Sequence, residues 1–93
     1  MSVTVTPPPE QLPVASFTYS CVRTTCTFDG RTSTDDRGIE SYAWNLGKQP
    51  DVTATGAITT FDYKRSGSYA VTLTVRDAAG NLDRLTRTIT VVK

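Results

Sequence analysis

The stretch SYAVTLTVRD, residues 68–77, decides the fold because its apolar and polar residues alternate strictly. Successive side chains of a β-strand point to opposite faces, so this alternation predicts a strand with one face in a core and the other in solvent. Threonines and Arg76 belong to the outward face of this expected strand. The expected inward residues are Tyr69, Val71, Leu73 and Val75.

The same period of two recurs on both sides of this stretch. Turn residues separate the segments, with glycine beside Asp, Ser or Asn in FDGR, KRSGS and DAAGN, and no stretch has a helical period. About seven short strands at this spacing predict an all-β protein, an immunoglobulin-like antiparallel β-sandwich. The other strand-like segments are VASFTYSC (14–21), CTFDG (26–30), GIESYAWNL (38–46), AITTFDY (57–63) and DRLTRTITVV (83–92).

The only tryptophan, Trp44, shares its expected face with Tyr42 and Leu46. Large aromatic side chains on the buried face of a central strand fill the core of immunoglobulin-like sandwiches. We therefore expect Trp44 in the core, and the alternative is a surface ring that stacks on a ligand.

Length and charge restrict the classes of partner. The 93 residues suit one domain, and the formal charge is +1 from ten basic and nine acidic residues that are scattered along the chain. Nucleic-acid binding requires a basic face, so no nucleic-acid partner is expected. No apolar run approaches the roughly 20 residues of a membrane span, so no membrane partner is expected either.

Three consecutive prolines near the beginning of the chain favour an extended backbone. Such a segment acts as a spacer and does not pack into a core. We expect a proline-rich linker in residues 1–12, with Met1 and Ser2 as an added start, and the sandwich domain in residues 13–93. No basic-then-apolar start resembles a signal peptide. The domain is expected to be part of a longer protein.

Two cysteines, Cys21 and Cys26, lie in YSCVRTTCTF. The chain has no histidine, so a C-x4-C pair falls short of the four ligands of a zinc site, and it is not a redox C-x-x-C. Two strands joined by a tight turn would place these cysteines opposite one another. We expect a disulfide, worth roughly 2 kcal/mol, against the alternative of two free buried thiols.

The segments PVASFTYSC, CTFDGRTSTDDRGIESYAW and GSYAVTLTVRDAAGN together closely resemble the PKD domain (polycystic kidney disease domain). GSYAVTLTVRDAAG follows the family block G-x-Y-x-V-x-L-x-V-x-D-x-x-G. The bacterial branch, found in secreted proteases, collagenases and chitinases, is the most similar. The resemblance covers about residues 13–92 and implies a core signature of Tyr42, Trp44, Gly47, Tyr69, Val71, Leu73 and Val75.

One departure follows Trp44. The family signature W-D-F-G-D-G is replaced here by Trp44-Asn45-Leu46-Gly47-Lys48-Gln49, so both acidic residues are lost. No role of that acidic turn is carried over, and Pro50 with Asp51 is expected to rebuild the turn.

Some family members from secreted collagenases bind calcium, so the resemblance implies a candidate calcium site and no other cofactor. The matching residues are Asp36, with Asp35 beside it, and Asp77. Calcium prefers six to eight oxygen ligands, which carboxylates and carbonyls of two loops could supply. Arginines lie next to these aspartates, and aspartates in loops often only form local turn hydrogen bonds, so a structural role is the alternative.

Catalysis has no support in the residues, because there is no histidine and Asp35 and Asp36 are neighbours in a turn. Binding of an insoluble polymer is the functional hypothesis. Among the aromatic rings, Tyr63 near a turn is the one expected to be exposed. Tyr69 is expected to be a corner tyrosine whose hydroxyl bonds to the backbone. Outward threonines with Arg76 and Arg87 would offer a hydrogen-bonding surface, although a solvated sheet face looks the same.

The sequence therefore predicts a non-catalytic accessory module of a secreted bacterial hydrolase, of protease or chitinase type. It would contact protein or polysaccharide substrate and space neighbouring domains of the same protein. The alternative is a structural or adhesive repeat of a cell-surface protein. A monomer is expected, because threonine-rich edge strands disfavour pairing with a second chain.

Overall fold

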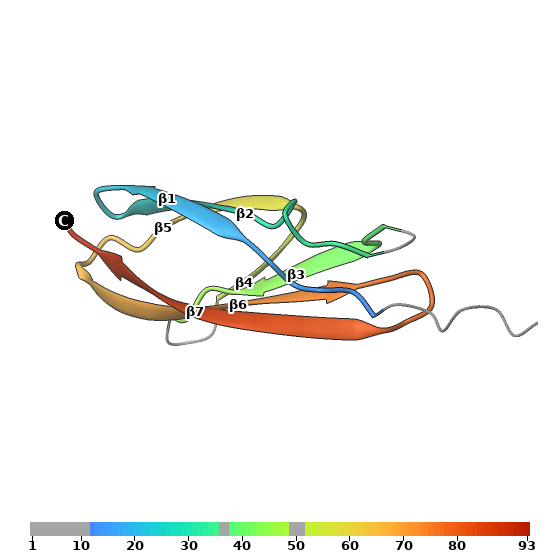
Figure 1. The fold of residues 1–93 in the computed structure, drawn as a ribbon. Coiled ribbons are helices and arrows are strands. Elements are labelled where there is room, and N and C mark those ends of the chain that lie inside the picture. The colour runs from blue at the N-terminus through green and yellow to red at the C-terminus, as the bar shows by residue number, and fades with distance from the viewer. Residues whose placement is uncertain (1–11, 36–37, 49–51) are drawn as a thin grey trace, which may run out of the picture.

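The computed structural model describes residues 12–35, 38–48 and 52–93, and these form seven β-strands in two antiparallel sheets (Figure 1). The three-stranded sheet has the order β1 (Thr18–Val22), β2 (Thr25–Asp29), β5 (Ile58–Asp62). The four-stranded sheet has the order β4 (Thr53–Thr55), β3 (Ser41–Asn45), β6 (Gly67–Arg76), β7 (Leu82–Val91). The two sheets lie over one another as the layers of a sandwich, which confirms the predicted all-β class. The described part of the chain has no helix long and apolar enough to cross a membrane.

The strand predicted from SYAVTLTVRD is β6, one of the two inner strands of its sheet. It pairs with β7 over ten residues, from Gly67 opposite Val91 to Arg76 opposite Leu82, and with β3 on its other side. Its inward residues Val71, Leu73 and Val75 are fully buried, as the alternation predicts. Burying a branched aliphatic side chain of this size stabilises the fold by about 1.5 to 3 kcal/mol each.

Trp44 lies at the centre of the core, with 1% of its surface exposed. Its ring packs edge-on against Phe17, with centroids 5.2 Å apart, and lies 5.7 Å from Phe28. The indole Nε1 donates a hydrogen bond of 2.8 Å to the carbonyl of Gly56, which satisfies its only polar atom. The core position expected for Trp44 is confirmed.

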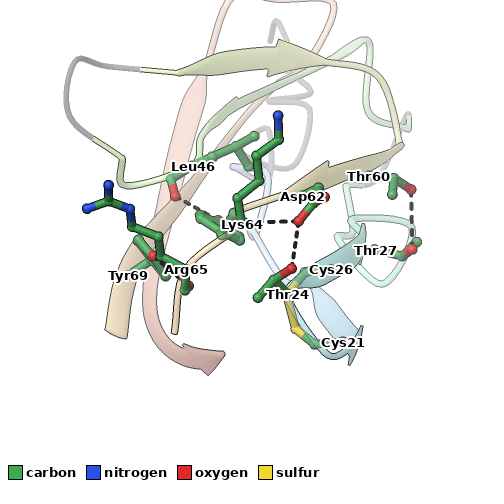
Figure 2. The surroundings of a disulfide bond; sticks show 11 residues. Cys21, Thr24, Cys26, Thr27, Leu46, Thr60, Asp62, Lys64, Arg65 and Tyr69 are labelled. Atoms are coloured by element: carbon green, nitrogen blue, oxygen red, sulfur yellow. Dashed lines mark hydrogen bonds between the residues drawn. A yellow bond between two sulfur atoms is a disulfide. The ribbon is translucent and has the colours of Figure 1, made fainter. Parts of the chain in front are cut away.

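The first hairpin carries the predicted disulfide, which joins Cys21 and Cys26 (Figure 2). The two cysteines are directly opposite in the β1–β2 register, and their Cα atoms are 4.0 Å apart. A two-residue turn of Arg23 and Thr24 closes the hairpin, so the disulfide lies within one residue of the turn on each strand.

The turn after Trp44 begins with contacts made by Asn45 and Gly47 in place of the acidic residues of the family signature. The Asn45 side-chain oxygen accepts a 3.0 Å hydrogen bond from the Gly47 amide, a bond that an aspartate can also make. Leu46 is buried, with 1% exposed. Gly47 has φ +77° and lies so close to the Ala70 backbone that a Cβ would not fit. The expected roles of Pro50 and Asp51 lie outside the described residues.

Residues 1–11 of the expected linker also lie outside the described residues. Leu12 is exposed, whereas Pro13 is buried and the Ala15 amide donates a 2.8 Å hydrogen bond to the Asp83 carboxylate on β7. Packing of the described chain onto the sandwich thus begins at Pro13.

Candidate functional site

The outer face of the four-stranded sheet, the side away from the core, is mainly polar. Alternation places Thr72 and Thr74 of β6 on this face, opposite their inward aliphatic neighbours. In the register, Ala43 of β3 lies between Thr55 and Thr74, and Asn45 lies between Thr53 and Thr72. Cross-strand neighbours on one face are close enough to act together. Five residues with hydrogen-bonding groups, Asn45 and four threonines, therefore surround the small side chain of Ala43.

This arrangement forms a shallow hollow of about 490 Å³, which we call the outer hollow. The small Ala43 side chain does not fill the hollow. Threonine hydroxyls and the Asn45 amide supply hydrogen-bond donors and acceptors around it. One neighbouring threonine is already paired, since the Oγ1 atoms of Thr72 and Thr86 are 2.8 Å apart. The lining residues are Ala43, Trp44, Asn45, Thr53, Ala54, Thr55, Thr72 and Thr74.

The sequence predicted only part of this surface. Thr72 and Thr74 were expected to point outward, but Ala43, Asn45 and the threonines of β4 were not recognised as part of a site. The alternation of T-A-T in residues 53–55 was the available signal. It does not indicate which strand lies beside it, so the hollow could not be assembled from the sequence.

The arginines expected to join the outward threonines lie on different sides of the sheet. Arg76 does belong to the outer face, at the end of β6, and lies outside the outer hollow. Arg87 belongs to the inward row of β7, so its expected place among the outward threonines is wrong. Its guanidinium donates a 2.9 Å hydrogen bond to the Phe17 carbonyl and lies 5.5 Å and 5.2 Å from the ring centroids of Phe17 and Tyr19. Arg87 therefore links the edge of one sheet to the chain that enters the other.

Tyr63 is not the exposed ring that the sequence suggested. Its side chain is fully buried, stacks on Tyr69 with centroids 4.1 Å apart, and donates a 2.7 Å hydrogen bond to the Leu46 carbonyl. Desolvation by burial, with the nearby Tyr69 as a smaller cause, raises the pKa of Tyr63 to about 12. The prediction of exposure failed because the chain after β5 turns inward, its Tyr63 amide bonding to the Thr24 carbonyl at 2.8 Å.

The other rings also leave no stacking platform on the outer face. Tyr69 is partly buried and its hydroxyl donates a 2.9 Å hydrogen bond to the Arg65 carbonyl, which is the backbone contact expected of a corner tyrosine. Tyr19, with 37% exposed, lies on β1 in the three-stranded sheet beneath the Arg87 guanidinium. Contact through the outer face would therefore rely on hydrogen bonds rather than on ring stacking.

The aspartates of the candidate calcium site have separate environments. Asp77 has only 1% exposed, and its carboxylate accepts hydrogen bonds from the amides of Ala79 and Asn81 and from the Asn81 side chain, at 2.9 to 3.1 Å. Burial alone would raise the pKa of Asp77, but the hydrogen bonds from Asn81, Ala79 and Gly80 outweigh it and lower the pKa below its usual value. These contacts close the β6–β7 turn.

Asp35 is half-buried in the loop between β2 and β3, and Asp36 lies outside the described residues. Among the described residues, no group of three or more His, Cys, Asp or Glu side chains gathers as metal ligands. A calcium site at Asp35, Asp36 and Asp77 stays a prediction, and the turn contacts of Asp77 are its observed role.

The arrangement of strands and the sequence agree with a known family. The family model described as the PKD domain matches residues 7–92. The Pre-pro-metalloprotease PrtV of Vibrio cholerae serotype O1 is 38% identical over 79 residues, which is 85% of this chain. The chain spans only 8% of the length of that protease.

Solved structures give the same result. The PKD1 domain of the Vibrio cholerae metalloprotease PrtV has a TM-score of 0.81 and 38% identity, covering 89% of this chain and 100% of that one. The PKD1 domain of Vibrio anguillarum Epp has a TM-score of 0.82 and 32% identity, covering 89% and 96%. A third solved structure has a TM-score of 0.78 and 34% identity, covering 92% of this chain and 36% of that one. It comes from work on the promiscuous specificity of carbohydrate-binding modules from the β-sandwich superfamily. From sequence and structure together, this chain belongs to the PKD domain family.

Proposed function

We propose that the chain is a non-catalytic accessory module of a secreted bacterial hydrolase and that it contacts an insoluble substrate through the outer hollow. The observation that carries the proposal is the hollow itself, where Asn45 and four threonines surround Ala43. Hydroxyl and amide groups both donate and accept hydrogen bonds, so they suit the hydroxyl groups of a polysaccharide or the backbone of an extended protein.

The relatives support the secreted setting. Similar domains occur in a bacterial metalloprotease and in a chain described with carbohydrate-binding modules. The disulfide between Cys21 and Cys26 suits an oxidising compartment outside the cytoplasm. The substrate is expected to be a protein or a polysaccharide polymer, and the test uses both.

The positions of the chain ends support a spacing role alongside substrate contact. Near its start the chain is hydrogen-bonded to Asp83 at the beginning of β7, and Lys93 follows the end of the same strand. A ten-residue strand is about 33 Å long, so neighbouring domains would attach at opposite ends of the sandwich (Figure 1). The same geometry would serve a repeat of a cell-surface protein.

The test is retention of the oxidised chain on insoluble collagen, chitin and cellulose, with calcium and with a chelator. Ala43→Gln fills the outer hollow, and Ala70→Gln makes the same change at an exposed β6 position outside it. We expect retention on one polymer, lost in the Ala43 variant and kept in the Ala70 variant. Passage through all three polymers would contradict substrate contact and leave the spacing role. A loss of retention with chelator would support the calcium prediction.

A further inference from the structure

Positive charge gathers at the end of the sandwich that carries the C-terminus. We call this the basic end and define it by Arg23, Lys48, Lys64, Arg65 and Lys93. They come from the β1–β2 turn, the segment after β3, the β5–β6 turn and the end of the chain. Half of the chain's ten basic residues are thus at this end, which the net charge of +1 conceals.

Backbone and side-chain contacts hold these four segments together. The Tyr63 amide donates to the Thr24 carbonyl at 2.8 Å, so the β5–β6 turn lies against the β1–β2 turn. The Lys48 ammonium lies 3.5 Å from the Tyr63 carbonyl and 5.6 Å from the centroid of the Phe61 ring. The Lys93 amide donates to the Ser66 hydroxyl at 2.6 Å. The segments that carry these charges therefore meet at one end of the sandwich although they are far apart in sequence.

Asp62 is the one acidic residue that the described chain brings to this end, and its carboxylate serves the backbone. One oxygen accepts a 2.7 Å hydrogen bond from the Thr24 hydroxyl and a 2.9 Å bond from the Lys64 amide. The Thr24 hydroxyl, then the Lys64 amide, and then the charges of Lys64 and Lys48 lower the pKa of Asp62. Five side-chain cations face the Asp62 carboxylate and, in the 93-residue chain, the terminal carboxylate of Lys93, which leaves an excess of three positive charges among the described residues.

The backbone at this end is also unusual. Arg23 has φ 55° and Lys64 has φ 65°, and these are the two non-glycine residues of the described chain with positive φ. Left-handed backbone costs about 1 to 2 kcal/mol for a residue with a Cβ, and such strain is concentrated at functional sites. The disulfide hairpin holds the first turn, and the bond from the Tyr69 hydroxyl to the Arg65 carbonyl holds the second (Figure 2).

We propose that the basic end binds an acidic polysaccharide, a glycan with repeating carboxylate or sulfate groups. Arg23, Lys64, Arg65 and Lys93 are exposed, so they present their charges outward rather than into a pocket built for one small anion. The charges also come from both sheets, and a linear polymer with repeating anions can meet several of them at once. The polymer would bind through many weak, salt-sensitive contacts. This surface is distinct from the outer hollow.

The test uses the 93-residue chain on immobilised heparin, polygalacturonate and neutral dextran at increasing salt. The double variant Arg23→Gln/Lys64→Gln removes two charges from the basic end. Arg76→Gln/Arg84→Gln is the matched control, because it removes the same charge from β6 and β7 at the opposite end of the four-stranded sheet. Circular dichroism and denaturant unfolding check the fold, and Arg65→Gln/Lys93→Gln replaces the first variant if its fold is lost.

We expect retention on the two acidic glycans, no retention on dextran, and affinity about tenfold weaker in the basic-end variant. Affinity for nucleic-acid polyanions falls with salt, and each lost ionic contact makes the slope of log affinity against log salt shallower by roughly 0.7 to 0.9. The double variant should therefore make the slope shallower by about 1.5. The control should elute like the wild type. Equal weakening of both variants would show binding by net charge alone and overturn the proposal. Absence of retention, or binding to phosphatidylserine vesicles without binding to the glycans, would overturn it too.

Discussion

Replacing Arg87 with alanine should destabilise the fold without affecting retention on a polymer, because this side chain joins the two sheets at their edge. The guanidinium donates a 2.9 Å hydrogen bond to the Phe17 carbonyl and lies over the rings of Phe17 and Tyr19 at 5.5 Å and 5.2 Å. Alanine removes all three contacts and leaves the Phe17 carbonyl without this donor.

The size of the effect follows from these contacts. A net hydrogen bond contributes about 0.5 to 1.5 kcal/mol, and each exposed cation–π contact contributes about 0.5 to 1 kcal/mol. The two ring contacts share one guanidinium, so a simple sum is an upper bound, and we expect a loss of about 2 kcal/mol. For a domain of this size that loss lowers Tm by roughly 10 °C.

Urea unfolding followed by tryptophan fluorescence measures this loss as a change in midpoint at constant slope. Arg84→Ala is the matched control, because Arg84 is on the same strand but points outward opposite Thr74. The loss should be similar at low and high salt, since the contacts join a cation to a carbonyl and to rings rather than to an anion. A loss below about 0.5 kcal/mol for Arg87→Ala, or equal losses in both variants, would refute the role assigned to Arg87.

Trp44→Ala should cost about 3 to 5 kcal/mol because it empties the centre of the core. Urea unfolding followed by circular dichroism measures this loss, since the variant has no tryptophan. A cost under about 1 kcal/mol would return Trp44 to the surface. Replacing both Cys21 and Cys26 with alanine should cost roughly 2 kcal/mol by freeing the unfolded hairpin, and an unchanged midpoint would contradict a stabilising disulfide. Burial raises the pKa of Tyr63 from 10.0 to about 12. The contribution of its neutral hydroxyl to the free energy of unfolding is therefore fully present below pH 10 and declines as pH rises towards 12. Tyr63→Phe should show a smaller decline over this range, and identical pH dependence in both proteins would be inconsistent with the buried hydroxyl.

The sequence alone indicated six of the seven strands, the family and the disulfide, but not the short strand β4 (Thr53–Thr55). Alternation in a strand is a local property with a period of two, so SYAVTLTVRD was enough to assign Val71, Leu73 and Val75 to the core. The cysteine pair was similarly local, because a short hairpin can place Cys21 and Cys26 opposite one another whatever the rest of the chain does.

Only the tertiary structure decided what surrounds each face. Arg87 follows the inward row of β7, but it lies at a sheet edge, where an inward residue can reach the chain entering the other sheet. Tyr63 is buried because the segment after β5 folds against the β1–β2 turn.

The outer hollow and the basic end were equally inaccessible to sequence analysis. Ala43 faces Thr55 and Thr74 only after β3 has paired with both β4 and β6. The basic end brings together four segments whose charges look scattered along the chain. Pairing register and the meeting of distant turns depend on long-range contacts, and a local pattern of apolar and polar residues holds no information about them.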